Sequence, residues 1–157
     1  MNKSLSIPEW HQLAQEGTKI PVRITLNGWS MEPLIRMDKD YVTVVPSETT
    51  PQIGDIVMFQ EPNRKRFVMH RVWDLKEQKV LTWGDNCLEP DGWIPLDAVW
   101  GRITLIERGR RRIQPNPAKG IRWARFWHHA AKIYRPYIQC KNKLRNILEK
   151  TGMWVKK

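Results

Sequence analysis

The sequence predicts a mainly β protein, a small antiparallel β-domain with a short helix before it and a basic helical segment after it. Between residues 20 and 107, short runs rich in Val, Ile, Thr and aromatic residues alternate with turn signals. A capping-box pattern precedes these runs, and apolar residues at helical spacing follow them. We expect an N-terminal helix within residues 1–19, a β-domain over 20–109, and a basic linker and helical tail over 110–157.

The first element is a predicted helix that starts near Ser6. Ser6 and Glu9 have the spacing of a capping box, and Pro8 falls in the first turn, where its missing N–H does no harm. Trp10 begins a series of apolar residues at helical intervals, and Gly17 can end the helix.

Six strands are predicted next. Turn signals bound them, among them Ile53-Gly54-Asp55 and Glu89-Pro90-Asp91-Gly92. Short strands at this spacing are typical of an antiparallel sheet that folds on itself. The six runs are IPVRITLN from Ile20, YVTVV from Tyr41, DIVMFQ from Asp55, FVMHRVW from Phe67, KVLTW from Lys79 and VWGRITLIE from Val99.

The tail has a different pattern. Gly109, three arginines and two prolines end the strand pattern and indicate a linker. Apolar residues then recur every three or four positions from Ile121 to Ile138, with Arg and Lys between them, which predicts an amphipathic basic helix with a kink near Pro136. Residues 144–148 extend it as a second short segment.

The charge is confined to this tail. Residues 1–109 carry 13 Lys and Arg against 15 Asp and Glu, a net −2, whereas residues 110–157 carry 14 against 1, a net +13. A nucleic-acid-binding core needs a concentrated basic face, so the slightly acidic body argues against one. The basic tail over 110–157 could still meet an anionic membrane surface.

The expected location is cytoplasmic, with the membrane surface as an alternative position. The N-terminus lacks the apolar region of a secretory signal, and no stretch has the ~18 apolar residues of a membrane span. Cys87 and Cys140 have neither a disulfide-framework nor a metal-ligand spacing, so we expect reduced thiols.

Four serines and four histidines limit the candidates for nucleophilic catalysis. Ser30 stands in Asn27-Gly28-Trp29-Ser30-Met31-Glu32-Pro33, where a predicted strand ends and the chain turns. A serine at such a corner can project its hydroxyl from the sheet edge, and Gly28 allows a substrate backbone to approach. The alternative is a turn residue whose hydroxyl bonds to the nearby backbone.

His70 is the candidate general base. In the predicted strand it shares a face with Val68 and Val72. It could be a hydrogen-bonded core residue, but partial burial would keep the imidazole neutral near pH 7, as a general base requires. A serine hydroxyl needs such a partner to become a useful nucleophile.

Asp85, Glu89 and Asp91 share one predicted loop, and one of these carboxylates could orient the imidazole. An Asx-turn is the alternative role, and it suits Asp85 beside Gly84 better than it suits Asp91. These acids lack the ligand spacing of a calcium loop, and His70 has no nearby partner ligand, so no metal or other cofactor is expected.

The order of these motifs resembles the signal peptidase I family, within the wider group that includes the self-cleaving domains of SOS-type repressors. The resemblance covers about residues 22–107. The motifs similar to the family's boxes are Gly28-Trp29-Ser30-Met31-Glu32-Pro33, Asp38-Lys39-Asp40-Tyr41-Val42, Ile53-Gly54-Asp55-Ile56-Val57, His70-Arg71-Val72 as in the archaeal and endoplasmic-reticulum branch, Gly84-Asp85-Asn86 with Asp91, and Gly101-Arg102-Ile103.

The resemblance implies a serine endopeptidase that cleaves a peptide or protein precursor without a cofactor. It implies a dyad of Ser30 and His70, Asp91 in preference to Asp85 as the acid that orients His70, and the Ser30 backbone N–H in the oxyanion hole. The chain departs from the family in three ways: it begins with a predicted helix instead of a membrane anchor, Cys87 stands where a second Asn is common, and the tail has no counterpart.

A non-catalytic or self-cleaving regulatory module is the alternative, with the basic tail binding nucleic acid or a membrane. No helix-turn-helix pattern precedes the β-domain, so nucleic acid is not the expected partner. The substrate, its cleavage preference and the oligomeric state stay open at this level.

Overall fold

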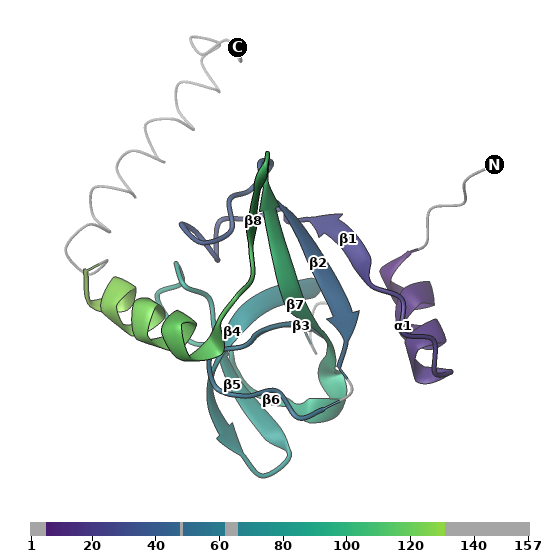
Figure 1. The fold of residues 1–157 in the computed structure, drawn as a ribbon. Coiled ribbons are helices and arrows are strands. Elements are labelled where there is room, and N and C mark those ends of the chain that lie inside the picture. Colours follow the sequence, from purple (N-terminus) through teal and green to yellow (C-terminus); the bar gives the residue numbers. More distant parts are fainter. Residues whose placement is uncertain (1–5, 48, 62–65, 131–157) are drawn as a thin grey trace, which may run out of the picture. The chain divides into compact units, whose positions relative to one another are not determined.

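The chain folds around an antiparallel β-sheet, as shown by a computed structural model that describes residues 6–47, 49–61 and 66–130 (Figure 1). The sheet has the order β1-β2-β7-β3-β4-β5-β6, with β8 paired to β7. Its strands are β1 (Val22–Thr25), β2 (Tyr41–Pro46), β3 (Ile56–Gln60), β4 (Phe67–Lys76), β5 (Lys79–Trp83), β6 (Gly92–Pro95), β7 (Val99–Arg108) and β8 (Arg111–Ile113).

Every strand pair is antiparallel, so the predicted mainly β, antiparallel class is confirmed. A 3₁₀ turn, η1 (Leu96–Ala98), joins β6 to β7. By its internal contacts the chain divides into two compact units, Met1–Ala124 and Arg125–Lys157, and the sheet belongs to the first.

The N-terminal helix α1 (Ile7–Gln15) forms where the capping box predicts it. The Ser6 hydroxyl accepts the Glu9 N–H at 3.4 Å, and the Glu9 carboxylate accepts the Ser6 N–H at 2.9 Å. These reciprocal bonds satisfy two helix-end donors. Trp10 is the buried residue of α1, and its indole N–H donates to the Ile20 carbonyl at 2.6 Å.

Two strands lie where the sequence patterns predict none. β8 occupies the start of the predicted linker, because Gly109 adopts φ +57° and lets a tight turn join Arg108 to Arg111. β6 pairs with β5, but its four residues begin at a glycine and end at a proline, which conceals the alternation. The sheet therefore includes residues after Gly109.

A second helix covers residues 117–130 of the described chain. It begins after Asn116, whose side-chain oxygen accepts the Lys119 N–H at 3.0 Å. The predicted kink near Pro136 and the segment 144–148 lie outside the described residues. Within the part of the chain that the structure describes, neither helix has the length and apolar character that crossing a bilayer requires.

The core holds the connection between β1 and β2 in place. Met31 and Ile35, both 1% exposed, pack with core residues of β2, β3 and β7. The Asp40 carboxylate is fully buried, accepts the Arg36 N–H at 2.9 Å, and pairs with Arg108 at 2.6 Å. Ser30 precedes the first of these anchors, so the core determines the position of its backbone.

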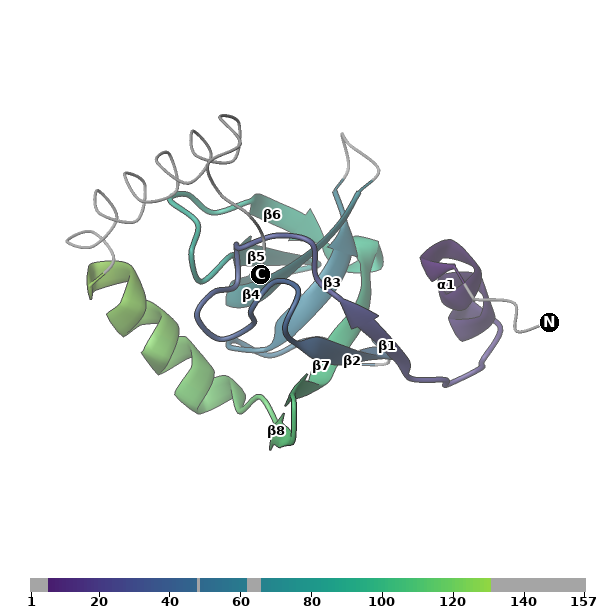
Figure 2. The ribbon, with the colours of Figure 1, turned by 90° about the horizontal axis from the view of Figure 1, so that it is seen from above.

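A second cluster takes the opposite face of β3 and extends over β4, β5 and β6, so it supports the strand that carries His70. Its buried members are Val57, Phe59, Val72, Val80, Ile94 and Val99. In the view of Figure 2 the β1–β2 connection passes over β4 and β5. The Asn86 N–H, from the β5–β6 connection, donates to the Ser30 carbonyl at 2.7 Å. Two connections far apart in sequence thus meet beside β4.

Candidate active site

Ser30 lies in the β1–β2 connection, and its backbone is held on two sides. On one side, Met31 is buried in the core. On the other, Asn86 donates its N–H to the Ser30 carbonyl at 2.7 Å and its side-chain amide to the Trp29 carbonyl at 3.2 Å. Ser30 lines a cavity, and its carbonyl oxygen binds the β5–β6 connection.

His70 lies on β4, is only 5% exposed, and is oriented by Asp91. Its Nδ1 donates to Asp91 Oδ2 at 2.6 Å, and the same carboxylate oxygen accepts the Thr82 hydroxyl at 2.8 Å. The Asp91 N–H also donates to the Thr82 carbonyl at 2.9 Å. Two hydrogen bonds to Thr82 on β5 therefore hold Asp91, and Asp91 in turn orients the imidazole. Nε2, on the other side of the ring, faces away from Asp91.

His70 Nε2 and the backbone of Ser30 both approach Gly84. A Cβ placed on Gly84 would lie 2.8 Å from His70 Nε2, 2.8 Å from the Ser30 carbonyl oxygen and 2.6 Å from Cys87 Sγ. No side chain fits at these distances, so glycine is required for the three residues to converge. Cys87 Sγ lies 3.9 Å from His70 Nε2.

Ser30 and His70 line the same cavity, which has a volume of about 350 Å³. Among the residues that the structure describes, no hydrogen bond joins the Ser30 hydroxyl to the imidazole. The cavity is lined by the start of the β1–β2 connection, by Arg66 and the first part of β4, and by the β5–β6 connection. The lining residues are Leu26, Asn27, Gly28, Ser30, Arg66, Phe67, Val68, Met69, His70, Cys87 and Asp91.

The first part of β4 presents a backbone edge beside this cavity. Phe67 to His70 pair with β3 on one side. β5 pairs with β4 only from Arg71 onward, so among the described strands none covers the other edge of residues 67–70. An extended peptide could add to this edge.

The electrostatics of His70 correct one prediction. Burial lowers the pKa of His70, but the hydrogen bond to Asp91, the contact with Cys87 and the charges of both outweigh burial and raise it to about 9. The prediction that partial burial keeps the imidazole neutral near pH 7 is therefore wrong. The ring is mostly protonated at that pH, and its pair with Asp91 is a charged one.

The structure separates the three predicted acids. Asp85 is fully buried and forms a two-pronged ion pair with Arg71, with Oδ1–Nε at 2.8 Å and Oδ2–Nη2 at 2.7 Å. Glu89 is exposed. The Asp91 carboxylate is the one on His70. Asp85 thus anchors its loop, next to the residues that contact Ser30.

Gly28, two residues before Ser30, also lines the cavity. A Cβ there would meet no atom within 4 Å, so glycine leaves the cavity open at this position and relieves no clash.

Thr82 and Arg71 were assigned no role from the sequence. Thr82 could have been noticed as a polar residue on the inward face of β5, between Val80 and Gly84, but no pattern signals that an arginine will be buried.

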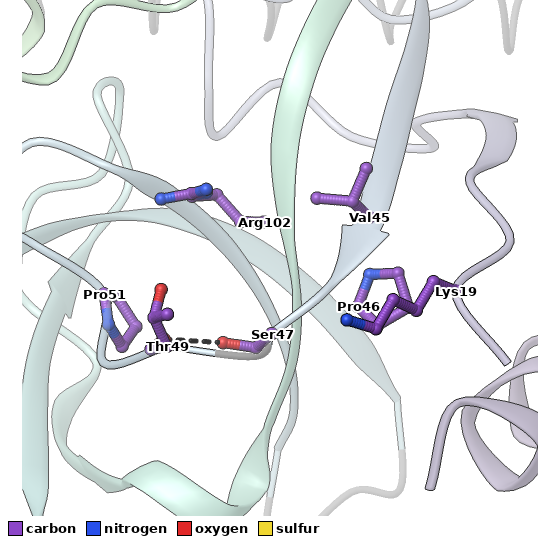
Figure 3. Close-up of a pocket in the computed structure, with 7 residues that line it drawn as sticks. All are labelled: Lys19, Val45, Pro46, Ser47, Thr49, Pro51 and Arg102. Atoms are coloured by element: carbon purple, nitrogen blue, oxygen red, sulfur yellow. Dashed lines mark hydrogen bonds between the residues drawn. The ribbon is translucent and has the colours of Figure 1, made fainter. Parts of the chain in front are cut away.

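A second cavity, of about 280 Å³, lies by the end of β2 (Figure 3). There the Ser47 hydroxyl donates to the Thr49 carbonyl at 3.4 Å, and none of the lining residues is a histidine. Its lining consists of Lys19, Val45, Pro46, Ser47, Thr49, Pro51 and Arg102.

In the described part of the chain, no group of three or more His, Cys, Asp or Glu side chains is arranged to hold a metal ion.

Comparison of the sequence with known proteins assigns no family to the chain. No protein-family model matches the sequence, and a search of curated proteins returns no significant match. Function must therefore be inferred from the residues of the site themselves.

Proposed function

We propose that the chain is a serine endopeptidase similar to signal peptidase I, with Ser30 as nucleophile, His70 as general base and Asp91 as the acid that orients it. One observation carries the proposal. The imidazole is held by Asp91 at Nδ1, and its Nε2 faces the point at Gly84 where the Ser30 segment also converges. Nucleophile, base and orienting acid thus line one cavity.

The reaction would follow the acyl-enzyme route. Neutral His70 accepts the Ser30 hydroxyl proton at Nε2 while Ser30 Oγ bonds to the scissile carbonyl carbon. The Ser30 N–H donates to the oxyanion. As the C–N bond breaks, the imidazolium gives its proton to the leaving amine, and water, activated by the same imidazole, then hydrolyses the ester. Asp91 stabilises the imidazolium at each proton transfer.

The free enzyme needs one adjustment before this chemistry. The hydroxyl must come within about 3.2 Å of Nε2, and catalytic hydrogen bonds of free enzymes often tighten only when substrate binds. Cys87 Sγ, 3.9 Å from Nε2, is the atom that the hydroxyl displaces from this position. This movement would fall to the Ser30 side chain, because the backbone on both sides of it is anchored by the core and by Asn86.

The substrate would be an extended peptide or protein precursor. Its backbone could pair with the uncovered edge of β4 at residues 67–69, where main-chain hydrogen bonds would supply affinity independent of sequence. The cavity wall includes Leu26, Phe67 and Val68, so we expect apolar side chains next to the cleaved bond.

An anionic membrane surface is the partner proposed for the C-terminal segment over residues 110–157. In the helix 117–130, Ile121 and Ala124 are buried, whereas Trp123 is 40% and Phe126 is 64% exposed. An arginine directly precedes each of the two exposed aromatic residues. Aromatic side chains among basic ones suit the interface of an anionic bilayer.

A peptide-library experiment tests the peptidase proposal. The purified chain is incubated at pH 9 with a mixture of peptides of all side-chain classes, and new termini are identified by mass spectrometry. Cleavage should be lost in Ser30→Ala and retained in Ser47→Ala, the matched change at a serine that does not line the cavity of Ser30 and His70. Equal cleavage by Ser30→Ala and the unchanged chain would exclude Ser30 as nucleophile.

A further inference from the structure

The Arg71–Asp85 ion pair lies directly behind the catalytic residues. Arg71 follows His70 on β4, and Asp85 precedes Asn86 in the loop that contacts Ser30. The two side chains are 1% and 0% exposed, and Arg71 Nη1 also donates to the Gly54 carbonyl at 2.9 Å. Burying two charges is costly, so such a pair is stable only while its geometry is kept and its remaining hydrogen bonds are made.

The first turn of the helix that begins at residue 117 closes over this pair. A Cβ built on Gly120 would collide with Arg71 Nη1 and lie 3.3 Å from its Cζ. A Cβ on Gly54 would collide with the Pro117 carbonyl. Two glycines thus allow the helix to approach, although glycine in a helix costs about 1 kcal/mol relative to alanine. Close packing on Arg71 explains why glycine stands at position 120.

The pair connects this turn to the catalytic groups. Asp85 is flanked by Gly84, against which His70 Nε2 lies, and by Asn86, which holds the Ser30 carbonyl. A displaced guanidinium would carry the Asp85 carboxylate with it, since two bonds join them. The loop 84–87 would then shift relative to both Ser30 and His70.

We propose that Gly120 is a positioning residue for the peptidase reaction: by closing over the Arg71–Asp85 pair, it fixes the loop 84–87 and so aligns Ser30 with His70. This inference rests on the proposed function. It makes the first turn of the C-terminal helix part of the catalytic machinery, although Gly120 touches neither the substrate nor the reacting atoms.

Gly120→Ala in the full chain is the first test. Alanine favours the helix but pushes the guanidinium off the Gly54 carbonyl. We expect kcat to fall about ten- to a hundredfold while KM changes less than about twofold, because misplacement of reacting groups affects the chemical step. The matched control is Ala118→Gly, at an exposed position of the same turn, which should keep kcat within about twofold.

A double variant separates this contact from a general loss of stability. Lysine lacks Nη1, so in the Arg71→Lys background Gly120→Ala should change kcat by less than about twofold. If Gly120→Ala alone does not fold, the double variant must be the more stable of the two in thermal unfolding. An equal cost of Gly120→Ala in both backgrounds, or a double variant that is no more stable, would overturn the inference.

Titration of His70 by NMR gives a readout that does not depend on activity. In Gly120→Ala, a shifted loop weakens the contacts that raise the pKa of His70, which should fall by about half a unit or more. A chain that cleaves nothing but shows this fall would refute the peptidase proposal and leave the coupling intact. An unchanged titration with unchanged kcat would refute the coupling alone.

Discussion

Asp91 Oδ2 lies 2.6 Å from His70 Nδ1 and also accepts the Thr82 hydroxyl at 2.8 Å. One carboxylate oxygen therefore links two strands, β4 and β5, through side chains that are 21 and 9 residues from it in the sequence. The link sets both the direction of Nε2 and the charge state of the ring.

Asp91→Asn should remove the charge and keep the shape. The amide can still meet Nδ1, but it no longer stabilises an imidazolium, so we expect kcat to fall about a hundredfold or more. The pKa of His70 should fall as well, since burial then acts with less opposition. Steady-state kinetics and an NMR titration measure the two effects. Glu89→Gln, at an exposed carboxylate of the same loop, is the control, and an equal loss in that variant would contradict the role of Asp91.

Activity should increase with pH up to about 9. Below the pKa of His70 the ring is protonated and cannot accept the Ser30 proton, and that pKa is raised to about 9. The rate constant kcat/KM should therefore rise about tenfold per pH unit below 9 and level off above it. A profile already flat between pH 7 and 9 would contradict a general base whose pKa is about 9.

The fold follows from local patterns wherever the pattern is complete. The capping box of Ser6 and Glu9 predicts α1, and alternating β-branched residues predict the longer strands. β6 and β8 are not predicted because each is too short to show a period. In addition, β6 begins at Gly92 and β8 follows Gly109, and both glycines have a positive φ.

The candidate site is less accessible to sequence patterns. A pattern can indicate that His70 is buried, but burial and a paired carboxylate shift its pKa in opposite directions, and the distance to the carboxylate decides which effect is larger. Asp85 and Asp91 occupy one loop, and the sequence does not show which of them meets His70. Only the folded structure shows that Asp85 pairs with Arg71 and Asp91 with His70.

Asp85→Asn should act on stability first. It leaves the Arg71 guanidinium buried without its counter-charge, which costs about 3 kcal/mol or more. Chemical denaturation should show this loss, whereas Asp97→Asn, at an exposed acid, should stay within about 0.5 kcal/mol of the unchanged chain. A stability loss no larger than that of Asp97→Asn would mean that the Arg71–Asp85 pair does not hold the loop.

Trp123 and Phe126 should contribute to membrane binding. The chain should float with vesicles of phosphatidylserine and phosphatidylcholine, but less with phosphatidylcholine alone, since basic residues add about 1 kcal/mol each at an anionic surface. The double change Trp123→Ala/Phe126→Ala should lower the partition coefficient about tenfold or more. Leu88→Ala, at an apolar side chain that is 59% exposed, is the control. Failure to float with anionic vesicles would exclude this partner.

The most direct measurement is the site of acylation. Cys87 Sγ also lies near Nε2 of His70, so the two candidate nucleophiles compete for one base. The chain is mixed at pH 9 with a p-nitrophenyl ester, quenched in acid within seconds and mapped by tandem mass spectrometry. We expect the acyl group on Ser30 of the unchanged chain. The corresponding peptide of Ser30→Ala should carry no acyl group, and acylation of Ser30 in His70→Ala should be at least about tenfold lower. An acyl group on Cys87 that persists in Ser30→Ala, or no adduct at either residue, would contradict the assignment of Ser30 as nucleophile.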